Sequence, residues 1–250
     1  MRQAAERALE WRHRSETASH LYLEDLGLPA ENRVWHDPSE WIPVRRAFRR
    51  LGVRPGDVCV DFGSGLGRAL LVAAEFPFDR VLGVELSEQM NAVARRNVER
   101  NRSRFRARSV EIVTADALIY EVPDDMSVAY MYCPFYGEVF EGVMEKLFAS
   151  VDRRPRALRL VYNYPAEQRF LATSARVRLI DAVPGTWPRK ALLTPKTILT
   201  YLVLPSDDAA AAELVQRFPP RLRGAERWLE PYDPGFGLEK PERLGGKVSR

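Results

Sequence analysis

Residues 57–67 read Asp-Val-Cys-Val-Asp-Phe-Gly-Ser-Gly-Leu-Gly and decide the fold. The short apolar run in this stretch ends in an acid, Asp61, and a helical stretch begins at Arg68. Between them three glycines alternate, at Gly63, Gly65 and Gly67. Strand, glycine turn and helix bring bare backbone up to a nucleotide in α/β proteins, because glycine adopts positive φ at little cost. We therefore expect this turn to bind a nucleotide-like ligand.

The spacing of the glycines separates two classes of ligand. The dinucleotide fingerprint is G-x-G-x-x-G, which lays a pyrophosphate on a helix N-terminus. Here the spacing is G-x-G-x-G, and Asp61 stands two residues before the first glycine. This pattern resembles motif I of the class I S-adenosylmethionine-dependent methyltransferases. That cofactor carries a cationic amino group and a sulfonium, which suit an acid, whereas a NAD-dependent dehydrogenase is disfavoured by the spacing.

Two later acids extend the resemblance, which covers about residues 50–165. Glu85 is the acid of the apolar run 80–87 and ends the second predicted strand. It follows Gly67 by 18 residues, close to the roughly 20-residue offset expected for an acid that binds ribose hydroxyls. Asp116 ends a third run, where the family's acid accepts the adenine amine and the next backbone amide reaches a ring nitrogen. Each acid taken alone is equally well explained as a helix cap. The resemblance implies these cofactor-binding residues: Asp61, Gly63, Ser64, Gly65, Gly67, Glu85, Leu86, Asp116, Ala117 and Tyr132.

The alternation of strand and helix patterns predicts an α/β fold. We expect a Rossmann-like, seven-stranded, mostly parallel sheet with helices on both faces and an antiparallel C-terminal hairpin. The strands are expected at 57–62, 80–85, 110–114, 127–132, 157–163, 176–183 and 197–204. Helices are expected at 66–76, 88–103, 136–150 and 166–173, with a short one near 116–120.

The chain divides into three predicted parts: an N-terminal helical extension (1–50), a cofactor-binding domain (51–205) and a C-terminal helix with an irregular tail (206–250). In the extension we expect one helix over 4–20 and a second over 40–50, the latter capped by Ser39. In the last part we expect a helix over 207–218. The tail beyond it is rich in Pro, Gly and charge, and Trp228, Tyr232 and Phe236 are the residues able to pin it to the body.

The fourth predicted strand leads into Tyr132-Cys133-Pro134-Phe135-Tyr136, where many methyltransferases hold the acceptor. Amino-methylating members place Asn-Pro-Pro-Tyr or Asn-Pro-Phe there, and the amide oxygen accepts from the target amine. Cys133 stands where that polar residue is expected, and a thiol is a weak partner. This departure counts against an amino acceptor. Predicted substrate-binding residues are Pro134, Phe135, Tyr136 and Asn163.

Methyl transfer draws much of its rate from proximity and alignment, and it needs a base only where the acceptor must lose a proton. His36, in a loop that covers the cofactor in related proteins, is the candidate base, and Tyr136 is the second candidate catalytic residue. The alternative for His36 is that it is an ordinary surface residue. The alternative for Tyr132 and Tyr136 is that they pack in the core with a hydrogen-bonded hydroxyl.

The central segment is also similar to the non-SET histone-lysine methyltransferases. The points of likeness are the glycine motif, the strand that ends at Glu85 and the long basic helix after it. The Asn-Asn-Phe of that family's acceptor loop is missing here. The likeness therefore bears on the cofactor half and does not establish a protein substrate.

The bulk composition excludes several classes of protein. Apolar residues make up 46% of 250 residues, enough for a core, and no apolar run approaches the ~20 residues that span a bilayer. The N-terminus lacks the apolar stretch of a signal peptide, so we expect a cytoplasmic protein with no membrane partner. Cys59 and Cys133 lie in apolar strands, and the three histidines are far apart, so no metal site is predicted.

The net charge is +4, and arginines gather between residues 95 and 108. We interpret this cluster as a solvated helix face with favourable charge at the helix C-terminus. A nucleic-acid-binding surface is the alternative. The sequence does not predict the oligomeric state.

Taken together, the sequence favours an S-adenosylmethionine-dependent methyltransferase that acts on a small molecule. A protein or nucleic-acid acceptor is the second hypothesis, in view of the arginine cluster and the family likeness. The third is a non-catalytic module that binds the cofactor or a partner, because the polar residue before Pro134 is missing.

Overall fold

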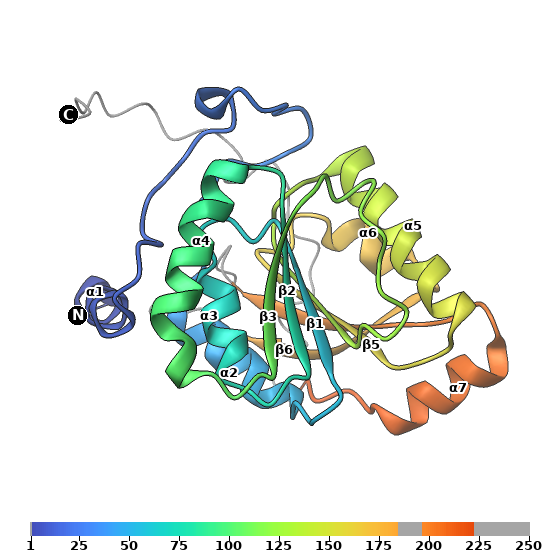
Figure 1. The fold of residues 1–250 in the computed structure, drawn as a ribbon. Helices are drawn as coiled ribbons and strands as arrows, with labels where there is room; N and C mark the ends of the chain where they lie inside the picture. The colour runs from blue at the N-terminus through green and yellow to red at the C-terminus, as the bar shows by residue number, and fades with distance from the viewer. Residues whose placement is uncertain (1, 185–196, 223–250) are drawn as a thin grey trace.

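The computed structural model describes residues 2–184 and 197–222. Its centre is one seven-stranded sheet in the order β3-β2-β1-β4-β5-β7-β6 (Figure 1). Strands β1 to β5 pair in parallel, and β7 is antiparallel to both β5 and β6, so β7 alone runs against the other six described strands. The predicted sheet and its closing hairpin are thereby confirmed. The strands are β1 (Val58–Phe62), β2 (Arg80–Glu85), β3 (Ser109–Thr114), β4 (Val128–Tyr132), β5 (Leu158–Asn163), β6 (Val177–Val183) and β7 (Ile198–Val203).

Helices cover both faces of the sheet, as the alternating pattern predicts. One face packs against α2, α3 and α4, and the other against α5 and α6 (Figure 1). The helices are α1 (Arg2–His13), α2 (Trp41–Leu51), α3 (Arg68–Ala74), α4 (Glu88–Asn101), α5 (Gly137–Arg153), α6 (Gln168–Thr173) and α7 (Asp208–Arg217), with short 3₁₀ turns η1 (Glu24–Leu26) and η2 (Arg102–Arg104). None of the described helices combines the length and apolar character needed to cross a bilayer.

The place of β1 in the sheet determines where a ligand binds. All five residues of β1 are buried, and β1 lies between β2 and β4. The chain runs outward through β2 and β3 on one side and then returns to start β4 on the other. In open α/β sheets ligands bind at the carboxyl ends of the strands, at such a reversal of strand order. The glycine turn after Phe62 lies at this point.

The first predicted helix is shorter than expected. It ends at His13, because Arg14 adopts a positive φ of 45° and the chain turns away. The carboxylate of Glu10 then accepts hydrogen bonds from the backbone N–H and the hydroxyl of Thr17. The rest of the predicted helix, through His20, is extended chain.

Two smaller expectations were wrong. Ser39 does not cap α2, which begins one residue later with Glu40 as its N-cap, and the Ser39 hydroxyl instead bonds the Tyr130 hydroxyl at 2.9 Å. No helix forms over 116–120. A single turn there is closed by the Asp116 carbonyl, and Pro123 disfavours helical conformation in the residue before it.

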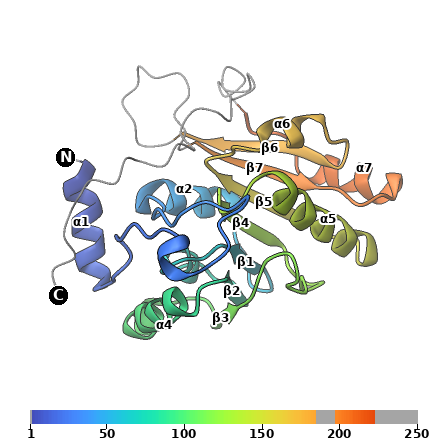
Figure 2. The same cartoon turned by 90° about the horizontal axis from the view of Figure 1, so that it is seen from above.

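The segment after α1 crosses the carboxyl ends of the strands, as Figure 2 shows in blue. It pairs with itself through Leu21 and His36, whose backbones exchange hydrogen bonds of 3.2 and 2.8 Å. It also pairs with the loop after β4, because the Val34 N–H bonds the Pro134 carbonyl at 3.0 Å. The segment and this loop therefore form one cover over the glycine turn. The residues beyond 222, which include the predicted tail residues Trp228, Tyr232 and Phe236, lie outside the described residues.

Candidate functional site

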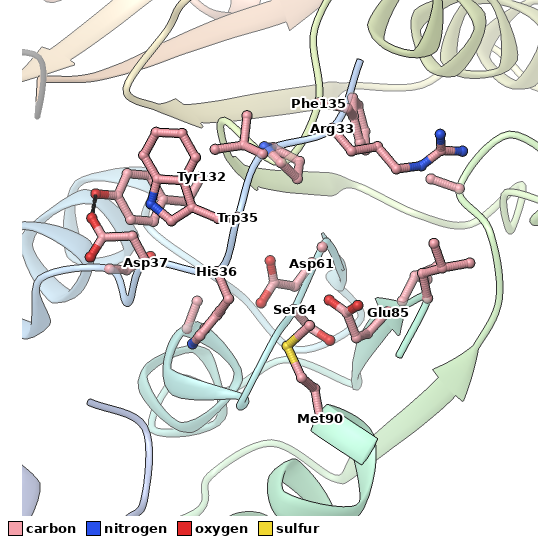
Figure 3. Close-up of a pocket in the computed structure, with 18 of the residues that line it drawn as sticks. Arg33, Trp35, His36, Asp37, Asp61, Ser64, Glu85, Met90, Tyr132 and Phe135 are labelled. Atoms are coloured by element: carbon pink, nitrogen blue, oxygen red, sulfur yellow. Dashed lines mark hydrogen bonds between the residues drawn. The ribbon is translucent and has the colours of Figure 1, made fainter. Parts of the chain in front are cut away.

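A cavity opens under this cover at the carboxyl ends of β1, β2, β3 and β4 (Figure 3). Acids from three neighbouring strand ends meet in it, as the sequence predicted. From the cover come Leu23, Arg33, Val34, Trp35, His36, Asp37, Pro38 and Ser39. The strand ends and the helices contribute Asp61, Gly63, Ser64, Arg68, Ala69, Val84, Glu85, Leu86, Met90, Ala115, Asp116, Ala117, Tyr130, Tyr132, Pro134 and Phe135.

Asp61 and Glu85 both extend into this cavity (Figure 3), near enough for the charge of Glu85 to act on Asp61. Asp61 is only 3% exposed, and its Oδ2 has no hydrogen-bond partner among the described residues. Burial, together with the charge of Glu85, raises the pKa of Asp61 well above its ordinary value. A buried carboxylate without a partner is costly, and a bound cation would remove that cost. The pair therefore forms a site for a positively charged group.

Glu85 is fixed by backbone donors on both oxygens. The N–H of Gly65 donates to Oε2 at 3.0 Å, and the N–H of Ser87 donates to Oε1 at 2.9 Å. Burial raises the pKa of Glu85, and these backbone donors oppose the rise. Each oxygen keeps a second lone pair, so the carboxylate can also accept from ligand hydroxyls. The Ser87 hydroxyl caps α4 by accepting from the Met90 N–H at 3.2 Å.

Asp116 already has a cationic partner from the cover. The Arg33 guanidinium donates to Asp116 Oδ2 at 2.6 Å, and the N–H of Leu118 donates to Oδ1 at 3.0 Å. This ion pair joins the cover to the end of β3. Sequence reasoning missed Arg33, because a single arginine in a loop far from the glycine motif carries no spacing signal.

His36 lies directly over the glycine turn. A Cβ built on Gly65 would come within 2.3 Å of His36 Nδ1, so the imidazole occupies the space that the missing side chain leaves. Its Nε2 is sealed from solvent and has no partner among the described residues. Burial lowers the pKa of His36 to about 4, so the ring is neutral at pH 7. A ring with this pKa is a weak base, and its position suits contact with a cofactor.

The acceptor loop after β4 is held in a strained shape. Cys133 has a positive φ of 39°, uncommon for a residue with a side chain, and its buried thiol has a pKa raised to about 12. The strain turns Pro134 and Phe135 into the cavity. A Cβ on Gly63 would lie 2.4 Å from Pro134 Cβ, so the glycine turn and the acceptor loop are in direct contact.

Tyr132 and Asp37 supply polar atoms beside this loop. The Tyr132 hydroxyl donates to Asp37 Oδ2 at 2.8 Å, the dashed contact in Figure 3. Burial first, and then the charge of Asp37, raises the pKa of Tyr132 well above its ordinary value, so the hydroxyl stays protonated. No sequence pattern marked Asp37, which is 95 residues away from Tyr132 along the chain.

The structure brings most, but not all, of the predicted site residues together. Two predicted glycines, Gly65 and Gly67, lie beneath the cavity floor and do not line it. Tyr136 does not line this cavity but a second one, which shares Arg33, Val34 and Trp35 with it. Asn163 is buried and donates to the Tyr130 hydroxyl at 3.1 Å, so it supports the neighbouring strand from behind. All other predicted residues line the cavity.

Comparison with known proteins agrees with this geometry. Residues 42–116 match the family model described as Histone methylation protein DOT1. The chain is 29% identical over 147 residues to ribosomal RNA small subunit methyltransferase A of Streptomyces avermitilis, covering 58% of this chain and 48% of that protein. It is 27% identical over 190 residues to the protein of the same name from Streptomyces griseus, covering 74% and 63%. The chain thus spans about half to somewhat under two thirds of these relatives.

Among solved structures, the chain is similar to a ribosomal protein L11 methylase from Lactobacillus delbrueckii, with 14% identity, a TM-score of 0.48, and coverage of 65% of this chain and 77% of that one. The sheet order and the site together define a Rossmann-like methyltransferase fold. These matches and the fold support a class I S-adenosylmethionine-dependent methyltransferase. S-adenosylmethionine is the cofactor of this class, and the buried Asp61 carboxyl, whose Oδ2 lacks a partner among the described residues, suits a positively charged group of that cofactor.

Proposed function

We propose that this protein binds S-adenosylmethionine in the cavity and transfers its methyl group to a base of RNA. The observation that carries the cofactor part is the buried Asp61 Oδ2, which lacks a partner and lies near a second carboxylate. A site built for pyrophosphate would not hold two acids at the glycine turn. A group that is cationic at neutral pH, such as an α-amino group, gives Asp61 the partner it lacks.

The three acids divide the cofactor among them in this proposal. Asp61 accepts from the amino group, Glu85 accepts from the ribose hydroxyls through its remaining lone pairs, and Asp116 with the Ala117 N–H holds the adenine edge. His36 packs over the methionine portion as a neutral ring. The bound cofactor supplies a methyl group that its sulfonium has already activated.

Asp37 and Tyr132 serve the acceptor side. The amide oxygen that related acceptor loops carry is missing at Cys133. Asp37, in the segment after α1, lines the same cavity and supplies a carboxylate oxygen instead. The carboxylate accepts a hydrogen bond from the acceptor's N–H or O–H and takes up its proton. Tyr132 orients Asp37 through the 2.8 Å bond. Pro134 and Phe135 offer an apolar wall to a flat acceptor.

The choice of RNA rests on the relatives, both of which bear the name of ribosomal RNA methyltransferases. It also agrees with the flat wall at Phe135. A small-molecule acceptor is the competing proposal, which the cover over the cavity favours because it limits the opening.

One experiment separates the two acceptors. The protein is incubated with methyl-tritiated S-adenosylmethionine and, in separate reactions, with total RNA, a protein extract and a metabolite extract. We expect label in the RNA, absent after ribonuclease treatment and absent with the Asp61→Asn variant. Label in the metabolite fraction alone would replace RNA by a small acceptor. Cofactor binding without label in any fraction would contradict the enzymatic proposal.

A further inference from the structure

Helix α1 is fastened to the end of α4, far along the chain. The Asn101 side chain donates to the His13 carbonyl at 2.7 Å, and its Oδ1 lies 3.2 Å from His13 Nδ1. The His13 ring in turn stacks on Trp41 with 4.4 Å between ring centroids. These contacts place α1 beside the arginine cluster of residues 95–108. Figures 1 and 2 both show α1 next to α4.

Arginines from both elements cover this place. The Arg104 guanidinium donates to the Arg12 carbonyl at 2.9 Å, and Arg100 reaches the Arg14 carbonyl at 3.5 Å. We call this region the α1–α4 surface. Its exposed side chains are Trp11, Arg12, Arg14, Arg96, Arg100, Arg102, Arg104, Arg106 and Arg108.

The α1–α4 surface keeps an excess of positive charge after its ion pairs are counted. Three of its arginines have acidic partners, in the pairs Arg100–Glu16, Arg102–Glu99 and Arg108–Asp79. The other five form no ion pair with an acid among the described residues: Arg12, Arg14, Arg96, Arg104 and Arg106. Of these, Arg96 lies near enough to Glu16 for its charge to help lower the pKa of that carboxyl. Exposed guanidinium groups bind phosphates in a bidentate way, which makes such a surface complementary to a polyanion.

Trp11 gives this surface an aromatic face. The Trp11 side chain is 83% exposed, although α1 has a buried side. The N–H of Arg14 donates to the Trp11 carbonyl at 2.9 Å. The only aromatic residue within the arginine cluster itself, Phe105, packs toward the core beside α3. Base stacking on an exposed aromatic ring beside arginines is the way in which single-stranded nucleic acids are held without sequence preference.

We propose that the α1–α4 surface binds single-stranded RNA, with the arginines on phosphates and Trp11 stacked on a base. The choice of RNA over DNA rests on the proposed function. The surface lies away from the cavity, because α4 runs roughly 17 Å from Met90 in the cavity to Asn101. It therefore anchors the substrate and takes no part in the chemistry. A vesicle surface would need an apolar helix face, which Trp11 alone does not provide.

Fluorescence polarisation with a labelled 20-nucleotide RNA at several KCl concentrations tests this proposal. The Arg96→Gln/Arg106→Gln variant should bind about tenfold or more weakly, and the slope of log affinity against log salt should fall by about 1.4, the value for two lost phosphate contacts on a single strand. Trp11→Ala should weaken binding about tenfold with an unchanged salt slope.

The matched control is Arg169→Gln/Arg178→Gln, which removes the same charge from exposed positions on α6 and β6, at the other end of the sheet. It should bind RNA like the parent protein. If the control variant loses as much RNA affinity as Arg96→Gln/Arg106→Gln, the binding depends on net charge alone, and the proposal is overturned. Parent-like binding by both surface variants would also overturn it, as would capture by phosphatidylserine vesicles that matches RNA binding and is lost in the same variants.

Polarisation and the methylation assay with tritiated cofactor, run on the same variants, separate this proposal from the proposed function. Asp61→Asn should keep full RNA affinity while it loses the cofactor. If RNA binds through Trp11 and the two arginines but receives no methyl group, the surface stands and the RNA acceptor fails. If RNA is methylated equally well by the surface variants at every RNA concentration, the surface fails and the proposed function stands. A rise in the KM for RNA at constant kcat in these variants supports both.

Discussion

Arg33 in the cover and Asp116 at the end of β3 form an ion pair at 2.6 Å across the mouth of the cavity. Both side chains are largely buried. In this arrangement the acid that the sequence assigned to the adenine amine is already oriented by a residue of the N-terminal segment. Because a carboxylate oxygen accepts two hydrogen bonds, Asp116 can keep Arg33 while it receives the adenine edge.

The Arg33→Ala variant tests the role of this pair. We expect S-adenosylmethionine to dissociate about tenfold faster, because a charge-assisted hydrogen bond of about 1.5–3 kcal/mol no longer holds the cover closed. The association rate should change little. Stopped-flow measurement of cofactor release gives both rates. Tighter cofactor binding by the variant would mean that Arg33 competes with adenine for Asp116.

The Asp37→Asn and Tyr132→Phe variants test the acceptor side. Asp37→Asn removes the proton acceptor and should lower kcat about 100-fold with little change in cofactor affinity, in the range typical of a general base. Tyr132→Phe leaves the carboxylate but removes its 2.8 Å hydrogen bond, and it should lower kcat by about tenfold. Single-turnover assays on the methylated RNA measure both effects. Unchanged turnover in Asp37→Asn would exclude Asp37 as the proton acceptor.

The burial of His36 predicts that the folding stability depends on pH. The pKa of His36 falls from 6.5 to about 4 on folding, because burial disfavours the charged ring. The unfolded chain therefore takes up a proton below pH 6.5 that the folded chain refuses, and stability falls as pH drops from 6.5 toward 4, by up to about 3 kcal/mol. His36→Phe should lose this dependence. Urea unfolding of both proteins at pH 7.5 and pH 5 measures the difference, and equal pH slopes would contradict the burial of the ring.

The contact between His36 and the glycine turn gives a fourth test. Gly65→Ala adds strain at a φ of +54° and also drives a methyl group into His36 Nδ1. Gly52→Ala is the control, since it has a similar φ of +64° with nothing within 4 Å and so carries strain alone, roughly 1–2 kcal/mol. We expect the larger loss of stability at Gly65, and its excess should disappear in a His36→Ala background. An excess that persists there would show that His36 is not the obstacle.

The sequence was sufficient for the sheet and for the three acids. The strand-turn-helix pattern around Asp61 is local, and parallel strands end at one edge, so acids at successive strand ends are brought together by the fold itself. The same logic placed Glu85 and Asp116 in the cavity. The sheet is confirmed, and the three acids lie in one cavity, because both depend on short-range pattern and on one topological rule. The roles of the acids toward a cofactor stay predictions.

The cover could not be predicted in the same way. Arg33 and Asp37 reach the cavity because the irregular segment after α1 folds back over the strand ends, and no periodicity marks such a path. For Asn163 the strand-end rule failed. Its position at the end of β5 predicted contact with the substrate, whereas its side chain is buried and donates to the Tyr130 hydroxyl. Trp11 was missed because its proximity to the arginines depends on the hydrogen bonds between His13 and Asn101.

The central claim is that the Asp61 carboxylate holds the cationic end of the cofactor. Calorimetric titration of S-adenosylmethionine into Asp61→Asn, with the exposed Asp125→Asn as the matched control, tests it most directly. Asp61→Asn should lose at least 100-fold in affinity while the free protein unfolds at a higher temperature, because the variant removes a buried charge that repels Glu85. Asp125→Asn should bind like the parent protein. Unchanged affinity in Asp61→Asn, in a folded protein, would contradict the account.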